Sequence, residues 1–392
     1  MASIDLLSPE ILHHIFLLGA QSSNNPRFIL GISHVYSLWR GLAVSSSDLW
    51  AYVIFKAHFD LEPRPWAEER RRALLEASSW DKSRPRDPRF EHYLKLSKTR
   101  PLDVKVILSM PQAEARKEET VAKYDIAYGD QIYKISNALQ ACDRRHLARI
   151  DTLTVSSDSY VGFSTFFGEL ERRLDLQECR CFKRLEIEWT GLMADAAKFF
   201  WPLQTLHAIS FLDKRPPHDL FPNLRCLSLR GVSANWENFE PRNLEELSIS
   251  NLHEDYRPSI TDLKSILGAS QETLRRMTLL TVGRRQDGTS TEWGSLLTLP
   301  NVHTLELGYE DPQELFALVC SILLPGLRNL TVRNTKGKRD RISDPGDTAY
   351  FLRTSQLFES LVAIWGLSRI ESVKLVDVQC MEDDVGYKHR LG

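Results

Sequence analysis

The sequence contains no hydrophobic run long enough to cross a membrane. No stretch of 18 apolar residues occurs in the 392, whereas a spanning helix needs about 20. The first twenty residues also lack the basic start of a signal peptide, since they hold Asp5, Glu10 and two histidines. We therefore expect no membrane partner and a location in the cytoplasm or the nucleus.

Surplus charge and paired cysteines are lacking as well. Lysine and arginine number 50 against 52 acidic residues, so the basic excess typical of nucleic-acid binding is missing and no nucleic-acid partner is expected. Only Cys179 and Cys181 of the six cysteines lie close together, and no second pair completes a zinc site. We expect free thiols in a reducing compartment and no metal.

The motifs of common enzyme classes are absent too. The chain has no phosphate loop, no dinucleotide fingerprint, no H-E-x-x-H and no G-x-S-x-G. His13 and His14 are neighbours, and on a helix their rings would point about 100° apart, which is a poor arrangement for sharing a metal. We predict no enzyme, no catalytic residue and no cofactor.

The first feature that the sequence does contain is a helical segment with few charged residues. Residues 1–55 carry only five charged residues. The triplet Ser8-Pro9-Glu10 is typical of a helix start, because serine can cap, proline suits the first turn and glutamate suits the helix dipole. Apolar residues follow up to position 18 and Gly19 offers a stop. A second helix is predicted from Ile32 to Ala43 by apolar spacing.

Two or three short helices cannot enclose this much apolar surface alone. They must pack either on the rest of the chain or on another protein. The ordered letters "LLSPEILHHIF … ISHVYSLWRGLAVSSSDLW" resemble the F-box motif, in its fungal F-box-like form. One departure is Ser8, which replaces the proline usual after the first leucine, but Pro9 keeps the helix start.

The resemblance implies a docking module for a Skp-type adaptor, which would link the chain to a cullin-RING ubiquitin ligase. Trp39 and Trp50 are expected to divide their surface between the module's own core and the interface. For every one of these positions a purely structural core role remains the alternative. The candidate adaptor-binding residues are Leu7, Pro9, Glu10, Ile11, Leu12, Ile15, Phe16, Val35, Trp39, Leu42, Leu49 and Trp50.

A charged connector follows. Residues 60–100 hold 19 charged residues, and helices are predicted over 66–80 and 90–97 with prolines between them. Alternating apolar residues predict a strand over 102–108. The "RPLDV" stretch at its start is similar to one in fungal F-box-like proteins and extends the resemblance weakly.

The rest of the chain repeats the pattern apolar-x-x-apolar-x-apolar nine times, at uneven steps. This pattern resembles a degenerate leucine-rich repeat, in which each copy supplies one strand and stacking forms a curved parallel sheet. Return helices are predicted over 262–269 and 312–324. An ordinary α/β domain with leucine-rich strands is the alternative. The middle residues of the copies are Leu153, Leu185, Ile209, Leu227, Leu247, Met277, Leu305, Leu330 and Val373.

The outward strand positions are the natural binding surface of such a sheet. They include Arg230 and Arg333, and Arg333 opens the basic run "RNTKGKRDR" with Lys336, Lys338 and Arg339. The run can be a solvated loop, a contact for an acidic or phosphorylated substrate segment, or a nuclear localisation signal. These five residues are the candidate substrate-binding residues.

Taken together, we expect an α/β chain with three parts. Residues 1–58 form a small all-α F-box module, 59–100 a charged helical linker, and 101–392 an irregular leucine-rich-repeat solenoid. The expected function is that of a substrate-recognition subunit of a Skp-cullin-F-box ubiquitin ligase with an unidentified protein substrate. A scaffold without a degradation role, or an enzyme with a site across the repeat surface, are the alternatives.

Overall fold

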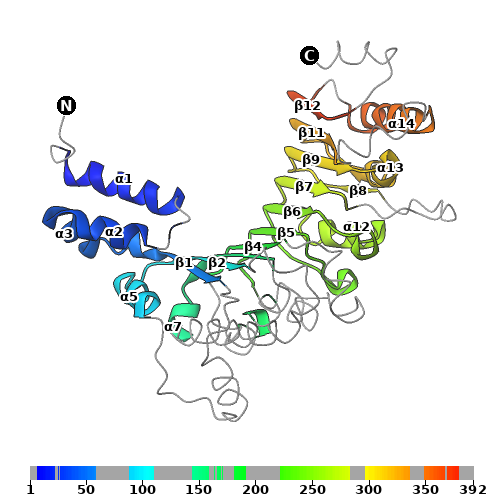
Figure 1. Cartoon of the computed structure of the whole chain (residues 1–392). Helices are drawn as coiled ribbons and strands as arrows, with labels where there is room; N and C mark the ends of the chain where they lie inside the picture. Colours follow the sequence, from blue (N-terminus) through cyan, green and yellow to red (C-terminus); the bar gives the residue numbers. More distant parts are fainter. Residues whose placement is uncertain are drawn as a thin grey trace, which may run out of the picture. The chain divides into compact units, whose positions relative to one another are not determined.

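A computed structural model describes residues 7–22, 25, 27–58, 88–109, 144–158, 163, 166–168, 170, 181–190, 221–282, 296–335, 348–366 and 369–378. The chain divides into two compact units. Unit 1 comprises residues 1–185 and 189–202, and unit 2 comprises residues 186–188 and 203–392. Figure 1 shows the helices and strands of both units, coloured along the sequence.

The fold is mixed α/β, as expected at that level. Ten of the described strands form one large sheet in the order β1-β2-β3-β4-β5-β6-β7-β9-β11-β12, and the pairings given by register are parallel. A second, two-stranded sheet pairs β8 (Leu297–Thr298) with β10 (Ile322–Leu323). The strands of the large sheet are β1 Tyr52–His58, β2 Leu102–Ser109, β3 Ile150–Ser157, β4 Arg184–Trp189, β5 Cys226–Arg230, β6 Glu246–Ser250, β7 Arg276–Leu280, β9 Thr304–Tyr309, β11 Asn329–Asn334 and β12 Ser372–Val376.

The repeated apolar pattern coincides with these strands. Eight of the nine copies run into a strand from β3 to β12, and the copy centred on Ile209 lies outside the described residues. In β5, Leu227 and Leu229 are buried while Ser228 and Arg230 face outward, because successive side chains of a strand point to opposite faces. The strand predicted over 102–108 is also confirmed, as β2.

The chain opens with a helix, α1 (Pro9–Ser22), whose start was predicted. The amide of Ile11 lies 3.5 Å from the hydroxyl oxygen of Ser8, at the N-cap. The stop at Gly19 is wrong, because α1 continues for three more residues. A Cβ at Gly19 would lie 2.2 Å from the ring of Phe28, so this glycine makes room for the next helix.

The second predicted helix is two helices, α2 (Phe28–Val35) and α3 (Ser37–Ser45). Tyr36 separates them with extended backbone angles, φ −151° and ψ 153°. The apolar spacing continues across this break, which is why the break is not visible in the pattern. A short 3-10 turn, η2 (Leu49–Ala51), then leads into the first strand.

The expectation that residues 1–58 are all α is wrong for the last seven of them. Tyr52–His58 form β1, which pairs with β2 from Tyr52 opposite Asp103 to His58 opposite Ser109. A single strand is stable only beside another, and the partner of β1 begins some fifty residues later. The local sequence therefore gives little sign of it.

The end of the connector also belongs to the core of unit 1. Helix α5 (Pro88–Leu96) matches the helix predicted over 90–97, and it buries Phe90, Tyr93 and Leu94. The indole of Trp50 meets the ring of Tyr93 edge to face, with ring centroids 4.9 Å apart. The helix predicted over 66–80 lies outside the described residues, and a short helix α7 (Arg144–Leu147) precedes β3.

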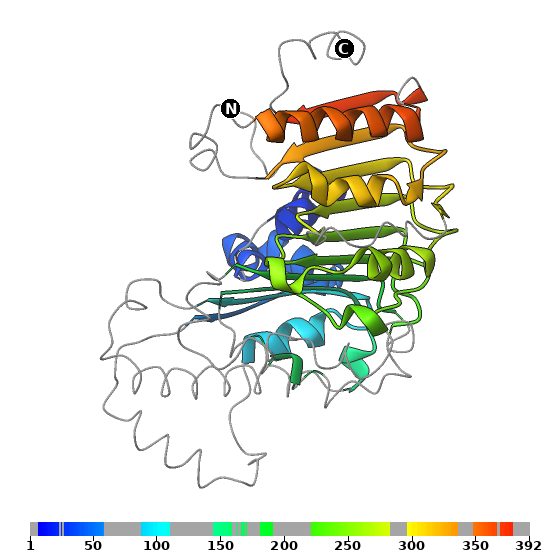
Figure 2. The ribbon, with the colours of Figure 1, turned by 90° about the vertical axis from the view of Figure 1, so that its right-hand side faces the viewer.

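In unit 2 the helices α12 (Ile260–Gly268), α13 (Pro312–Val319) and α14 (Thr348–Trp365) lie along one side of the strands (Figures 1 and 2). Helix α12 matches the return helix predicted over 262–269, whereas α13 matches only the first part of the one predicted over 312–324, because it ends at Val319 and Ile322–Leu323 form β10. Short 3-10 turns η5 (Trp236–Asn238) and η6 (Glu254–Tyr256) fill this layer after β5 and β6. The indole N–H of Trp365 donates to the carbonyl of Ile322 at 2.8 Å, which attaches the end of α14 to β10.

Candidate functional site

Helix α1 carries two apolar rows that face different surroundings. Leu12, Phe16 and Ala20 are buried in unit 1. A second row, which we call the α1 row, consists of Ile11, Ile15 and Leu18, and these side chains are 51%, 42% and 51% exposed. At about 100° per residue the two rows lie roughly 130° apart around the helix. One face of α1 therefore builds the core and another offers apolar surface to solvent.

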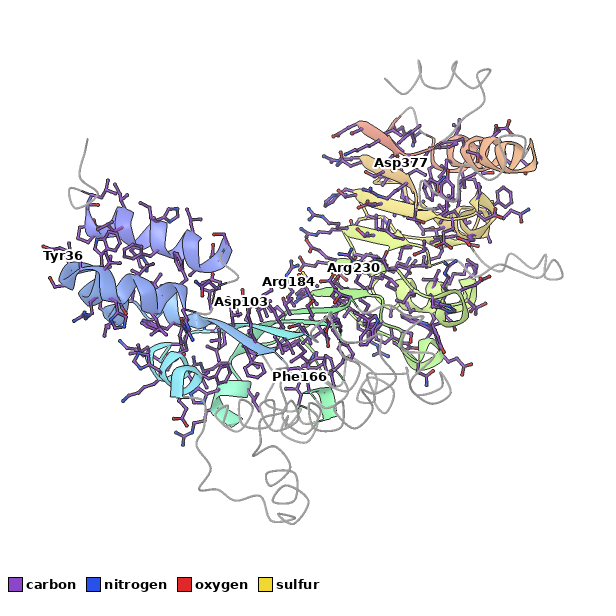
Figure 3. The ribbon with its side chains drawn as sticks, in the orientation of Figure 1. Tyr36, Asp103, Phe166, Arg184, Arg230 and Asp377 are labelled. Carbon is purple, nitrogen blue, oxygen red and sulfur yellow. The ribbon has the colours of Figure 1, made fainter. Side chains whose placement is uncertain are left out.

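A second exposed apolar group lies where α2 meets α3. Val35, Tyr36 and Leu38, which we call the turn patch, are 64%, 52% and 44% exposed. Figure 3 shows Tyr36 at the outer end of the α2–α3 pair. The extended backbone at Tyr36 turns the chain between two short helices, so these side chains have few neighbours of their own. Large exposed apolar groups of this kind mark protein interaction sites.

The structure divides the candidate adaptor-binding residues into three groups. Pro9, Glu10, Ile11, Ile15 and Val35 are exposed, and Leu7, Trp39 and Leu42 are half-buried. The remaining four, Leu12, Phe16, Leu49 and Trp50, are at most 3% exposed. Their expected role as direct contacts is corrected, because a buried side chain cannot meet a partner while the module keeps this structure.

These buried residues hold the exposed ones in place. The Phe16 and Trp39 rings pack edge to face with centroids 5.1 Å apart, which fixes α1 against α3. The indole N–H of Trp50 donates to the carbonyl oxygen of Ala43 at 2.7 Å and joins η2 to α3. The sequence did not single out Leu18, Tyr36 and Leu38, although Leu18 continues the spacing of Ile11 and Ile15.

Few charges border the α1 row. Glu10 directly precedes Ile11 in α1, and its hydrogen bond with the Ser8 side chain holds the pKa of its carboxyl below the usual range. On α3, the Nε of Arg40 donates to the carbonyl of Ser33 at 2.9 Å, so its guanidinium is tied to α2. An apolar centre with few charges is typical of the core of a protein interface.

The outward face of the unit 2 strands is polar and internally paired. The guanidinium of Arg230 lies 3.0 Å from the Glu188 carboxylate, and that of Arg333 lies 3.1 Å from Glu306. Arg230 and Arg333, the two candidate substrate-binding arginines that the structure describes, therefore already have an acidic partner, and Figure 3 places Arg230 on this face. Lys336, Lys338 and Arg339 lie outside the described residues. Ser250, the last residue of β6, is buried.

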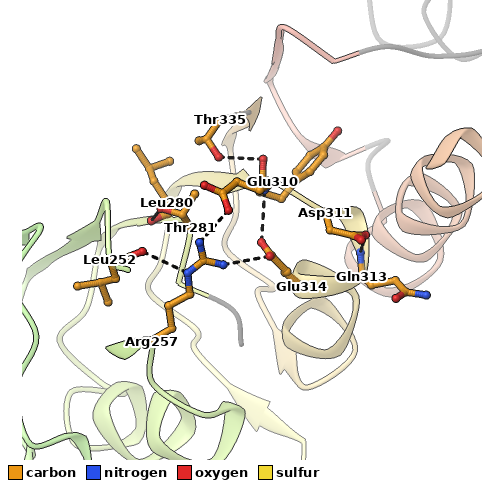
Figure 4. A network of polar contacts seen from close by, with 10 residues as sticks. Leu252, Arg257, Leu280, Thr281, Glu310, Asp311, Gln313, Glu314 and Thr335 are labelled. Carbon is orange, nitrogen blue, oxygen red and sulfur yellow. Dashed lines mark hydrogen bonds and ion pairs between the residues drawn. The ribbon is translucent and has the colours of Figure 1, made fainter. Parts of the chain in front are cut away.

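A buried polar network in unit 2 was not predicted (Figure 4). The Arg257 side chain is 4% exposed and lies 2.9 Å from Glu310 and 3.0 Å from Glu314. Its Nε also donates to the carbonyl of Leu252. The contacts join η6 to the start of α13, where Asp311 caps the helix. Arg257 lies far from the two glutamates in the sequence. Only the acidic residues at the start of α13 could have indicated such a network.

Unit 1 also contains a cleft of about 500 Å³, lined by α1, η2 and the first residues of β1, β2 and β3. Two of its carboxylates are paired within the chain: Asp48 with Arg100 at 2.6 Å and Asp151 with Lys183 at 2.6 Å. The hydrogen bond that Lys183 donates to the Asp151 carboxylate raises the pKa of Lys183. These two ion pairs join different segments of unit 1, so we interpret the cleft as a junction between structural elements.

The described part of the chain holds no group of three or more His, Cys, Asp or Glu side chains placed to bind a metal ion. No helix in that part combines the length and apolar character needed to cross a bilayer. No protein-family model matches the sequence, and no curated protein matches it either.

Proposed function

We propose that this chain is an F-box-like substrate receptor that binds a Skp-type adaptor through its N-terminal helices. The observation that carries the proposal is the α1 row: three large aliphatic side chains at exposed positions of a helix whose other apolar row is fully used in the core. The residues belong to the segment that resembles the F-box motif.

The geometry supports the α1 row and the turn patch as the contact surface. Burial of an aliphatic side chain of this size provides roughly 1.5–3 kcal/mol. Because Ile11, Ile15 and Leu18 are about half exposed, part of that free energy is not gained. A partner that covered the row would recover that free energy. The two tryptophans of the motif support this surface, because Trp39 packs α3 against α1 and Trp50 packs η2 against α5.

The repeated strands of unit 2 would then hold a protein target, in an irregular leucine-rich-repeat arrangement. The outward face carries paired charges and hydroxyls, and such a surface gives specificity through polar complementarity. The mechanism is tethering: a captured protein is held at high effective concentration near the ligase components, with no bond made or broken by this chain.

The test is coexpression of the full chain with a Skp-type adaptor, followed by size-exclusion chromatography and titration calorimetry. Wild type is expected to co-elute with the adaptor one to one. Ile11→Asp and Ile15→Asp each place a charge in the α1 row and are expected to weaken binding at least tenfold, or about 1.4 kcal/mol. Both positions are exposed, so the variants should fold.

Leu296→Asp is the matched control, because Leu296 is an equally exposed aliphatic residue in unit 2. It makes the same chemical change away from the α1 row and should leave adaptor binding unaltered. The proposal is refuted if wild type does not bind the adaptor, or if Leu296→Asp weakens binding as much as Ile15→Asp does.

A scaffold without a degradation role remains the second candidate. It would use the same adaptor surface, so the adaptor experiment does not separate it from a ligase receptor. Adding a cullin to the purified pair does: a ligase receptor forms a stable ternary complex, whereas a scaffold that excludes the cullin elutes only with the adaptor.

A further inference from the structure

The last strand of unit 2, β12, buries its apolar residues much less than the strands before it. In β5, β6, β7, β9 and β11 the two central inward residues are at most 2% exposed, as Leu330 and Val332 illustrate in β11. The equivalent residues of β12, Val373 and Leu375, are only half-buried. Val373 and Leu375 are therefore less covered than their equivalents in the earlier strands, and Figure 1 shows β12 as the last strand of the sheet, with α14 on one side.

The backbone of β12 is open on the same side. The Ser372 amide donates to the carbonyl of Arg328, just before β11, at 3.0 Å. Because the backbone groups of successive strand residues point alternately to the two sides, those of Ser372, Lys374 and Val376 face β11. The N–H and C=O groups of Val373 and Leu375 face away from it, and no described strand follows β12 in the sheet.

The charge of Lys374 indicates which kind of polypeptide segment can pair with the edge of β12. It lies at the centre of β12 opposite Thr331 and is exposed, and no other described residue forms an ion pair or hydrogen bond with it. A second copy of β12 placed antiparallel in matched register would set Lys374 against itself, which is destabilising. An acidic side chain opposite Lys374 would be favourable instead.

We infer that the open edge of β12 binds an extended segment of another protein, which adds a strand to the sheet. The segment carries an acidic residue opposite Lys374, flanked on both sides by apolar residues. The flanking side chains point toward α14 and cover Val373 and Leu375, while the main chain pairs with the free groups of Val373 and Leu375. This inference is independent of the proposed adaptor binding.

The test uses the immobilised full chain and a phage-displayed library of random seven-residue peptides. Selected peptides are expected to contain Asp or Glu between two apolar residues. Val373→Pro removes one outward N–H without breaking a bond to β11, since proline is tolerated at such edge positions. It should weaken binding of the selected peptides at least tenfold relative to Val373→Ala, which shortens the side chain but keeps the N–H.

Lys374→Glu is a second variant on the surface, and its selected peptides should carry Lys or Arg in place of the acid. Circular dichroism melts verify that each variant is folded. The inference fails if no peptide is enriched, if Val373→Pro and Val373→Ala bind equally, or if the charge preference does not reverse.

Two further results would also overturn it. A wild-type dimer that Val373→Pro converts to a monomer would assign the edge to a second copy. Binding that appears only after deletion of residues 379–392 would assign it to the chain's own C-terminus.

Discussion

The guanidinium of Arg257 lies 3.0 Å from the carboxylate of Glu314, and both side chains are at least nine-tenths buried. Glu314 also accepts a hydrogen bond from the amide of Glu310 at 3.3 Å, while the Glu310 carboxylate, about half exposed, completes the pairing of Arg257. The network connects the segment after β6 to the start of α13 (Figure 4). A buried pair of this kind is expensive to break on one side only.

Arg257→Leu is therefore expected to lower the free energy of unfolding by about 3–5 kcal/mol, because it leaves Glu314 charged, buried and unpaired. The double variant Arg257→Leu/Glu314→Leu should be more stable than that single variant, since both charges are gone. Urea denaturation of the full chain, followed by circular dichroism, measures both. A double variant less stable than Arg257→Leu would show that the packing at Glu314 matters more than its charge.

The same carboxyl should make stability depend on pH. Burial raises the pKa of Glu314 above its ordinary value of 4.5, Arg257 opposes the shift and the Glu310 charge adds to it. The folded state then holds the proton more tightly than the unfolded state. Its contribution to stability is complete below about pH 4.5 and is lost as the pH rises through the folded pKa.

Glu314→Gln removes this titration and provides the reference. The wild-type unfolding free energy minus that of the variant should fall as the pH is raised from 4.5 and then level off. Urea titrations at closely spaced pH values measure the difference. If it rises with pH, the attraction of Arg257 outweighs burial and the pKa is lowered instead.

Substitution of Trp50 should lower stability and substitution of Ile15 should hardly change it, although both were candidate adaptor contacts. Trp50→Phe keeps an aromatic ring near Tyr93 but loses the hydrogen bond to Ala43, so stability should fall by about 1–3 kcal/mol. Ile15→Ala truncates an exposed side chain and should change stability by less than about 0.5 kcal/mol. Thermal melts give both values. Equal losses would place Ile15 in the core and contradict an exposed α1 row.

Gly326 should tolerate no larger side chain. A Cβ there would lie 2.5 Å from the carbonyl oxygen of Pro300, a main-chain atom that cannot swing aside. Gly326→Ala is expected to cost about 1–3 kcal/mol, because the two segments that lead into β9 and β11 must separate. Urea denaturation provides the measurement.

Gly31→Ala is the control for that substitution. A Cβ at Gly31 meets nothing within 4 Å, and the residue lies inside α2, where alanine is favoured over glycine by up to about 1 kcal/mol. The control should therefore stabilise the chain. Destabilisation by both variants to the same extent would contradict the steric argument at Gly326.

Much of the local structure could be predicted from the sequence, because it depends on near neighbours in the chain. Ser8, Pro9 and Glu10 specify the start of α1 through capping and the helix dipole, whatever lies around them. The apolar-x-x-apolar-x-apolar copies specify strands because alternate residues must reach one buried face. The mixed α/β class follows from these strands together with the helices between them.

The candidate site was predictable only in part. Ile11 and Leu12 are adjacent and equally apolar, yet one is half exposed and the other fully buried, because α2, α3 and η2 cover only one side of α1. The break at Tyr36 and the strand β1 were missed for a related reason. Each depends on packing or pairing with a segment that local spacing does not reveal.

The sequence by itself determined those helices and strands that depend on near neighbours, such as the start of α1 and the strands of the repeated pattern, and which of their residues are apolar. Only the tertiary structure decided which apolar residues stay in water, which charges meet and where the sheet ends. Arg257 and Glu314 are separated by 57 residues, and their pairing comes from how α13 packs beside η6. The open edge at β12 likewise exists because no described strand follows it, a property of the assembled sheet that no residue of β12 carries alone.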